Sequence, residues 1–133
     1  MDAQDTKSAQ RLSQAYGGAK AVVQHYADSE VAEIVILDAV SASSPQPYVP
    51  YEDAAQLGMA VPPDQLVQVG QVACVVYNQG TAAGQKPTAE SVVVNYCQRT
   101  GSGLTVQLRA SGDLQHQPQQ MAALVEKAWT ALS

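Results

Sequence analysis

The two cysteines of the chain, Cys74 and Cys97, place the strongest constraint on its fold. Each lies in a run rich in β-branched residues, one over 68–79 and the other over 90–99, and such residues favour strands. The stretch between the runs, 80–89, contains glycine and proline and is typical of a hairpin connection. A register that pairs residue 74 with residue 97 places the two cysteines directly opposite each other, as a disulfide requires. The pattern therefore predicts a Cys74–Cys97 disulfide, with two buried free thiols as the alternative.

A disulfide here would stabilise the fold and indicate a compartment. On the chain-entropy model, closing a loop of this length contributes about 3 kcal/mol. Disulfides persist in oxidising surroundings, so we expect an extracytoplasmic or cell-envelope location, whereas free thiols would fit the cytoplasm. The first residues are no signal peptide, and no apolar run is long enough to cross a bilayer. We expect either a complete cytosolic protein or the soluble part of an exported one, with membrane contact only through a segment absent from this chain.

The spacing of apolar residues predicts two helices. They recur every three or four positions over 6–28, which predicts a first helix that Gly17 and Gly18 would weaken, bend or break. Residues 118–132 begin with a proline, which suits a first helical position, and carry one apolar face. This face includes Trp129, the only tryptophan, so we expect Trp129 to anchor the core.

Two further strands and one irregular segment complete the pattern. Residues 31–40 are rich in β-branched side chains, and 103–110 alternate between apolar and polar side chains as a half-buried strand does. Five prolines interrupt 41–65, which predicts irregular backbone there. Within it, residues 50–58 have acids near the start and a glycine at the end, which predicts a short helix. Residues 62–66 are expected to form a single turn.

The order of these elements predicts the fold class. A helix, a strand, a proline-rich segment, a three-strand meander and a final helix make an α+β fold. We expect an N-terminal helix, a mainly antiparallel sheet of about four strands and a C-terminal helix packed on one face of it. The length of 133 residues suits one domain over 1–133, in which 1–5 would be a flexible start.

Composition and motifs exclude several function classes. The net charge of −5 argues against nucleic-acid binding, which requires a basic surface. The two histidines, His25 and His116, have no partners at metal-ligand spacing, and both are expected at the surface or at helix ends. Ser111, Asp113 and His116 are close in sequence, but they are ordinary turn residues between a strand and a helix. We therefore expect no catalytic site, metal or cofactor, although an enzyme without a recognisable motif remains an alternative.

The irregular segment carries the candidate binding residues. Tyr48 and Tyr51 lie among prolines, and rigid aromatic side chains contribute contact area at low entropic cost. The adjacent Glu52 and Asp53 complete this speculative binding surface. The alternative is a loop packed onto the sheet with its tyrosines covering apolar side chains. A loose Ca²⁺ site that adds Asp64 is a further possibility, against acids that are simply solvated.

The last quarter of the chain resembles a known kind of domain. Residues 97–99, the alternating residues 104–110 and the alanine-rich closing helix are similar to the ends of extracytoplasmic sensor domains on actinobacterial receptor kinases and related lipoproteins. Those domains typically carry two disulfides, whereas this chain has cysteines for one. The resemblance implies a membrane-anchored or secreted protein and assigns no binding residue.

Together these patterns lead to one functional expectation. We expect a non-enzymatic extracytoplasmic binding or sensor domain, whose partner is a protein or a cell-envelope ligand of unknown identity and not a nucleic acid. A small cytosolic protein-interaction module is the alternative.

Overall fold

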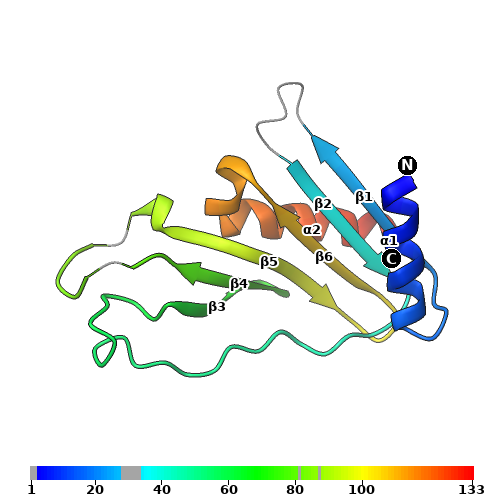
Figure 1. Cartoon of the computed structure of the whole chain (residues 1–133). Coiled ribbons are helices and arrows are strands. Elements are labelled where there is room, and N and C mark those ends of the chain that lie inside the picture. Colours follow the sequence, from blue (N-terminus) through cyan, green and yellow to red (C-terminus); the bar gives the residue numbers. More distant parts are fainter. Residues whose placement is uncertain (1–2, 28–33, 81, 87) are drawn as a thin grey trace.

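The computed structural model describes residues 3–27, 34–80, 82–86 and 88–133 (Figure 1). Its centre is an antiparallel sheet of six strands in the order β1-β2-β6-β5-β4-β3. The strands are β1 (Ala21–Ala27), β2 (Ile34–Val40), β3 (Asp64–Val69), β4 (Val72–Asn78), β5 (Val92–Thr100) and β6 (Thr105–Ala110). The helices are α1 (Ala3–Ala15) and α2 (Pro118–Leu132), with short 3₁₀ turns η1 (Ala89–Ser91) and η2 (Gly112–His116). The α+β class is confirmed, but the sheet has six strands instead of about four.

Helix α2 covers the apolar face of the sheet and has the predicted bounds. Pro118 occupies its first turn, and Met121, Ala122 and Val125 are buried against the sheet. Their partners are side chains of the four strands β2, β4, β5 and β6: Ala39, Val72, Cys74, Val76, Val94, Cys97, Val106 and Leu108. Trp129 packs at the edge of this core, with the Arg99 guanidinium 4.3 Å from the centre of its ring.

The predicted disulfide joins two neighbouring strands of this core, β4 and β5. Cys74 and Cys97 pair directly across β4 and β5, with their Cα atoms 4.0 Å apart and their sulfur atoms bonded. Both residues are completely buried. The predicted register is therefore confirmed at the cysteines, and a β-bulge between Val75 and Val76 shifts the rest of the pairing by one residue.

The first helix is shorter than predicted, because its glycines end it. The NH of Gly17 donates to the Gln14 carbonyl and the NH of Gly18 to the Ser13 carbonyl, and both glycines have positive φ. This is the Schellman arrangement that closes a helix at a left-handed residue. The second half of the predicted helix, 21–27, is strand β1 instead. At the other end, residues 3–5 form the first turn of α1.

The region after the proline-rich segment also differs from the prediction. The single strand expected over 68–79 is a hairpin of β3 and β4, which turns through Gly70 at φ +59°. Asp64 already belongs to β3, so 62–66 is not an isolated turn. Residues 50–58 form hydrogen-bonded turns at 54–58 instead of a helix. The rest of the proline-rich segment is irregular as expected, and residues 31–33 of the predicted strand lie outside the described residues.

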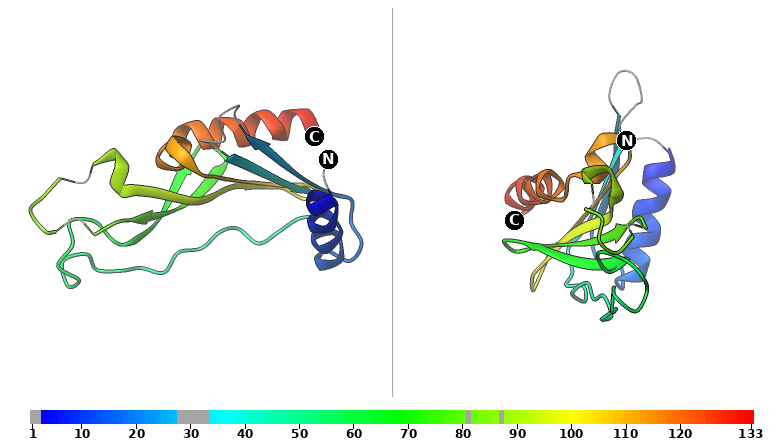
Figure 2. Two further views of the ribbon diagram at one scale, coloured as in Figure 1. Left: turned by 45° about the horizontal axis from the view of Figure 1, so that its top comes forward. Right: turned by 90° about the vertical axis from the view of Figure 1, so that its left-hand side faces the viewer.

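The two helices lie on opposite faces of the sheet, as the end-on view of Figure 2 shows. Strand β2 illustrates the division, because successive side chains of a strand point to opposite faces. Leu37 and Ala39 pack with the α2 core, whereas Ile36 and Asp38 line a cleft beneath α1. Helix α1 covers only the β1–β2 end of its face, and the proline-rich segment runs along the sheet beyond it (Figures 1 and 2). None of the helices in the described part of the chain is long and apolar enough to span a membrane.

Candidate functional site

Helix α1 makes a polar contact with the sheet near its start, and the residue after it contacts the proline-rich segment. Near the start, Asp5 is only 2% exposed and accepts two hydrogen bonds from His25 of β1. The main-chain NH of His25 donates to Oδ2 over 3.1 Å, and its Nδ1 donates to Oδ1. After the helix, the Tyr16 hydroxyl donates to Oγ of Ser44 over 2.8 Å. These contacts attach the start of α1 to β1 and the residue after α1 to the proline-rich segment.

The Asp5 carboxylate is stabilised in its charged form by this geometry. Burial raises its pKa, but the hydrogen bonds from the His25 main chain and ring lower it by more, so the pKa of Asp5 lies below its ordinary value. The fold therefore keeps this carboxylate charged as the acceptor that fixes α1 on β1.

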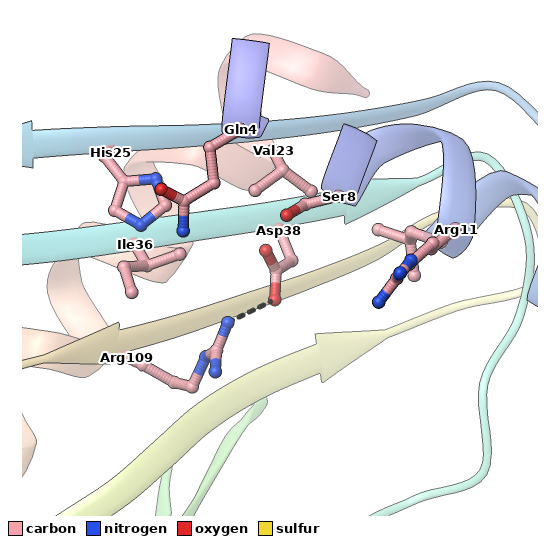
Figure 3. A pocket seen from close by; sticks show the side chains of 9 residues that line it. Gln4, Ser8, Arg11, Val23, His25, Ile36, Asp38 and Arg109 are labelled. Atoms are coloured by element: carbon pink, nitrogen blue, oxygen red, sulfur yellow. Dashed lines mark hydrogen bonds and ion pairs between the residues drawn. The ribbon is translucent and has the colours of Figure 1, made fainter. Parts of the chain in front are cut away.

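A cleft of about 380 Å³ lies between α1 and the sheet. Its walls come from α1, β1, β2 and β6 and combine apolar side chains with polar and charged ones (Figure 3). The lining residues are Gln4, Ser8, Arg11, Leu12, Val23, His25, Ile36, Asp38 and Arg109. We call this the α1 cleft. A smaller hollow of about 80 Å³ continues from it and shares Leu12 and Asp38.

Asp38 and Arg109 form an ion pair on the floor of the α1 cleft. Nη2 of Arg109 lies 3.3 Å from Oδ2 of Asp38, and the Asp38 side chain is much less exposed than the Arg109 side chain. Burial raises the pKa of the Asp38 carboxyl group above its ordinary value, although the Arg109 guanidinium pulls in the other direction. The site thus holds a carboxyl group that is poorly solvated and only singly contacted by its cation.

Arg11 supplies a second guanidinium from the opposite wall. It is exposed, it lines the α1 cleft, and the three ion pairs formed by the described residues do not include it. Figure 3 shows its side chain extending from α1 toward Asp38. The α1 cleft therefore offers hydrogen-bond donors from two arginines beside apolar side chains that include Val23 and Ile36. This arrangement suits recognition of a small molecule.

Polar side chains of β5 and β6 form hydrogen bonds with each other and with the main chain at the start of the proline-rich segment. Gln107 donates an amide hydrogen to Gln98, which donates in turn to the Pro45 carbonyl, both over 3.1 Å. Thr105 donates to the Ala42 carbonyl over 2.8 Å, and the Ser44 NH donates to Oγ1 of Thr100. These bonds fix the start of the proline-rich segment on the polar face. They also satisfy the buried polar side chains of Gln98 and Thr105, which would destabilise the fold without hydrogen-bond partners.

The speculative binding residues of the proline-rich segment lie outside the α1 cleft. Tyr48 and Tyr51 are 81% and 89% exposed, so they do not cover apolar side chains as the alternative required. Glu52 accepts a hydrogen bond from the Asp64 NH, and Asp53 accepts from the NH groups of Ala55 and Gln56. These acids therefore order the local backbone, and a binding role for the two tyrosines stays a prediction.

Both histidines form hydrogen bonds with other parts of the fold. His25 lies on β1 and not on a helix, and it contacts Asp5. His116 lies in η2, where Nδ1 donates to the Val92 carbonyl over 2.6 Å. Among the described residues, no three His, Cys, Asp or Glu side chains are grouped as a metal site would require.

The sequence interpretation missed the α1 cleft as a unit. A single acid, Asp38, within an otherwise apolar strand is a signal, and so is Arg109 on the polar side of an alternating strand. Pairing of β2 with β6 places Asp38 beside Gln107 and brings Arg109 within reach. No sequence signal indicated that Arg11 would face them from a helix. No family model, curated protein or solved structure matches this chain significantly. The candidate site is therefore argued from the geometry of its residues alone.

Proposed function

We propose that the chain is a non-enzymatic binding domain of an oxidising compartment outside the cytoplasm, and that the α1 cleft holds its ligand. The observation that carries the proposal is the cleft itself. Ligand sites are typically concave, of about 300–1,000 Å³, and combine apolar walls with a few converging polar groups. The α1 cleft, with a volume of about 380 Å³, has this size and composition.

The compartment is supported by the buried disulfide. A Cys74–Cys97 bond in the centre of the core belongs to the folded state and is typical of proteins that fold under oxidising conditions. The resemblance of the last quarter of the chain to extracytoplasmic sensor domains agrees with this location.

The ligand site is tested by blocking it. We expect fragments from a screen of small polar molecules to shift the backbone NMR signals of Ser8 and Ile36. The variant Ser8→Trp fills the α1 cleft and should abolish these shifts. Gln10→Trp is the matched control, because Gln10 lies two residues away on an exposed side of the same helix.

Comparison of the two variants distinguishes binding in the α1 cleft from binding elsewhere on the surface. Loss of binding in Ser8→Trp with retention in Gln10→Trp supports the α1 cleft as the site. Equal binding by both variants, or shifts confined to the proline-rich segment, would overturn it. The compartment is tested independently by quenching cells in acid, alkylating the denatured protein and measuring its intact mass, where two alkylated thiols would contradict an oxidising location.

A further inference from the structure

Arginines outnumber carboxylates among the residues that line the α1 cleft, although the chain as a whole is acidic and the Asp5 carboxylate lies behind His25. The sequence has a net charge of −5, yet the cleft is lined by two arginines and one carboxylate. That carboxylate, Asp38, already contacts Arg109. Arg11 is therefore the uncompensated charge, and Lys7 adds a second cation on the outer side of the same helix. A guanidinium without an ion-pair partner, such as that of Arg11, can attract an anion even in a protein whose net charge is negative.

The two guanidinium groups retain most of their hydrogen-bonding capacity. Each arginine has five NH donors, and Arg109 uses one nitrogen on Asp38 over a fairly long 3.3 Å. Guanidinium groups bind carboxylate and phosphate through paired, charge-assisted hydrogen bonds. The Ser8 hydroxyl lines the same space and adds a donor of moderate strength.

Three of the remaining lining residues are apolar, beside the polar side chains Gln4 and His25. Leu12 from α1, Val23 from β1 and Ile36 from β2 line the α1 cleft beside the charged groups. A ligand that satisfied only the arginines would leave these side chains in contact with water. The lining thus favours a molecule with one anionic group and one apolar part.

We infer that the α1 cleft binds a small organic anion, with its carboxylate or phosphate held by Arg11 and Arg109 and its apolar part on Leu12, Val23 and Ile36. This inference rests on the proposed function and gives its ligand a chemical class. Arg11 acts as the principal binding residue, because Arg109 is shared with Asp38.

Three closely related probes test the class of ligand. Benzoate and phenyl phosphate carry the two kinds of oxyanion on the same ring, and benzamide replaces the charge by a neutral amide. We expect one of the two anions to bind at least about ten times more tightly than benzamide, since charge-assisted hydrogen bonds are the strong ones. Chemical-shift titration follows the amides of Ser8 and Ile36 and the Nε–H signals of Arg11 and Arg109. The stronger anion distinguishes a carboxylate from a phosphate ligand.

Two variants assign the effect to a residue. Arg11→Gln removes the uncompensated charge and should abolish the preference for the anion. Lys7→Gln removes the same charge one helical turn away, outside the α1 cleft, and should change the affinity by less than about twofold, as expected for a screened surface charge.

Each other result has a definite meaning. Benzamide binding in the α1 cleft as tightly as the anions would overturn the inference and leave the proposed binding function standing. Equal losses in Lys7→Gln and Arg11→Gln would show general attraction to a positive surface, which also overturns it. If no probe and no fragment from the wider screen shifted Ser8 or Ile36, both the inference and the proposed function would fail.

Discussion

At the scale of single residues, a carboxylate accepts a hydrogen bond from one main-chain NH on each of the two edge strands of the sheet. Edge strands expose main-chain NH groups that can pair with another chain. Asp5 accepts from the His25 NH on β1, and Glu52 accepts from the Asp64 NH on β3. Each acid belongs to a segment outside the sheet. The same hydrogen bond therefore attaches that segment to the sheet and occupies one NH of an edge strand. For Asp5 the attached segment is α1, which forms one wall of the cleft.

The first prediction concerns the pH dependence of this attachment. The folded-state pKa of Asp5 lies below its ordinary value, so its contribution to stability is complete above the unfolded-state pKa of about 4 and is lost as the pH falls through the folded-state value. We expect Asp5→Asn to destabilise the protein and to speed amide exchange of His25 at pH 7. The difference from the wild type should shrink as the pH falls below about 4.

Urea unfolding at several pH values and hydrogen exchange of the His25 NH provide the measurements. Asp113→Asn is the control, because Asp113 is exposed in η2 and should leave both readouts unchanged. An Asp5→Asn protein with wild-type exchange at His25 would show that this carboxylate does not hold α1 in place.

Gly18 is the second residue with a specific conformational role. It has φ +92° and a Cβ built there meets nothing within 4 Å, so only the backbone conformation restricts this position. An L side chain in this region costs about 1–2 kcal/mol. We therefore expect Gly18→Ala to lower the free energy of unfolding by that amount. Gly103→Ala is the comparison, since Gly103 has the same open surroundings without a positive φ; an equal loss in both variants would contradict this explanation.

At the scale of elements, the two helices differ in how far the sequence predicts them. The buried residues of α2 recur at helical spacing on one face, and Pro118 marks its start, so its local pattern and its packing agree. In α1 the apolar spacing continues past Gly17 and Gly18 into 21–27, where the same residues fit a strand equally well. Pairing with β2 decides between the two structures, and it depends on residues outside the segment.

The packing of α2 leads to a prediction about which of its apolar residues matter. Met121 is completely buried against the sheet, whereas Leu124 is 38% exposed on the same helix. We expect Met121→Ala to lower the free energy of unfolding by about 2–5 kcal/mol, through lost burial and the cavity left behind. Leu124→Ala should cost less than about 1 kcal/mol, in line with surface substitutions. Chemical denaturation of both variants tests this. Similar losses in the free energy of unfolding would contradict the packing of Met121 against the sheet.

At the scale of the whole molecule, the sheet separates two kinds of surface. One face, under α2, is an apolar core with the disulfide at its centre, and the other carries the α1 cleft and the hydrogen-bonded polar side chains. The core could be predicted because its strands alternate in a local pattern and its cysteines define a register. The cleft could not, because Arg11, Asp38 and Arg109 are far apart in sequence and meet only when α1 lies on the face opposite α2.

This separation predicts that stability and ligand binding respond differently to loss of the disulfide. Cys74 and Cys97 are separated by 23 residues and lie in the α2 core, away from the lining of the α1 cleft. Replacing both by alanine should lower the free energy of unfolding by about 3 kcal/mol, because the unfolded chain gains the entropy of an open loop. Under conditions in which the variant stays folded, the NMR signals of Ser8 and Ile36 should keep their wild-type positions. Unchanged stability would contradict a structural role for the bond, whereas altered cleft signals would show that the two faces of the sheet are coupled through β5 and β6.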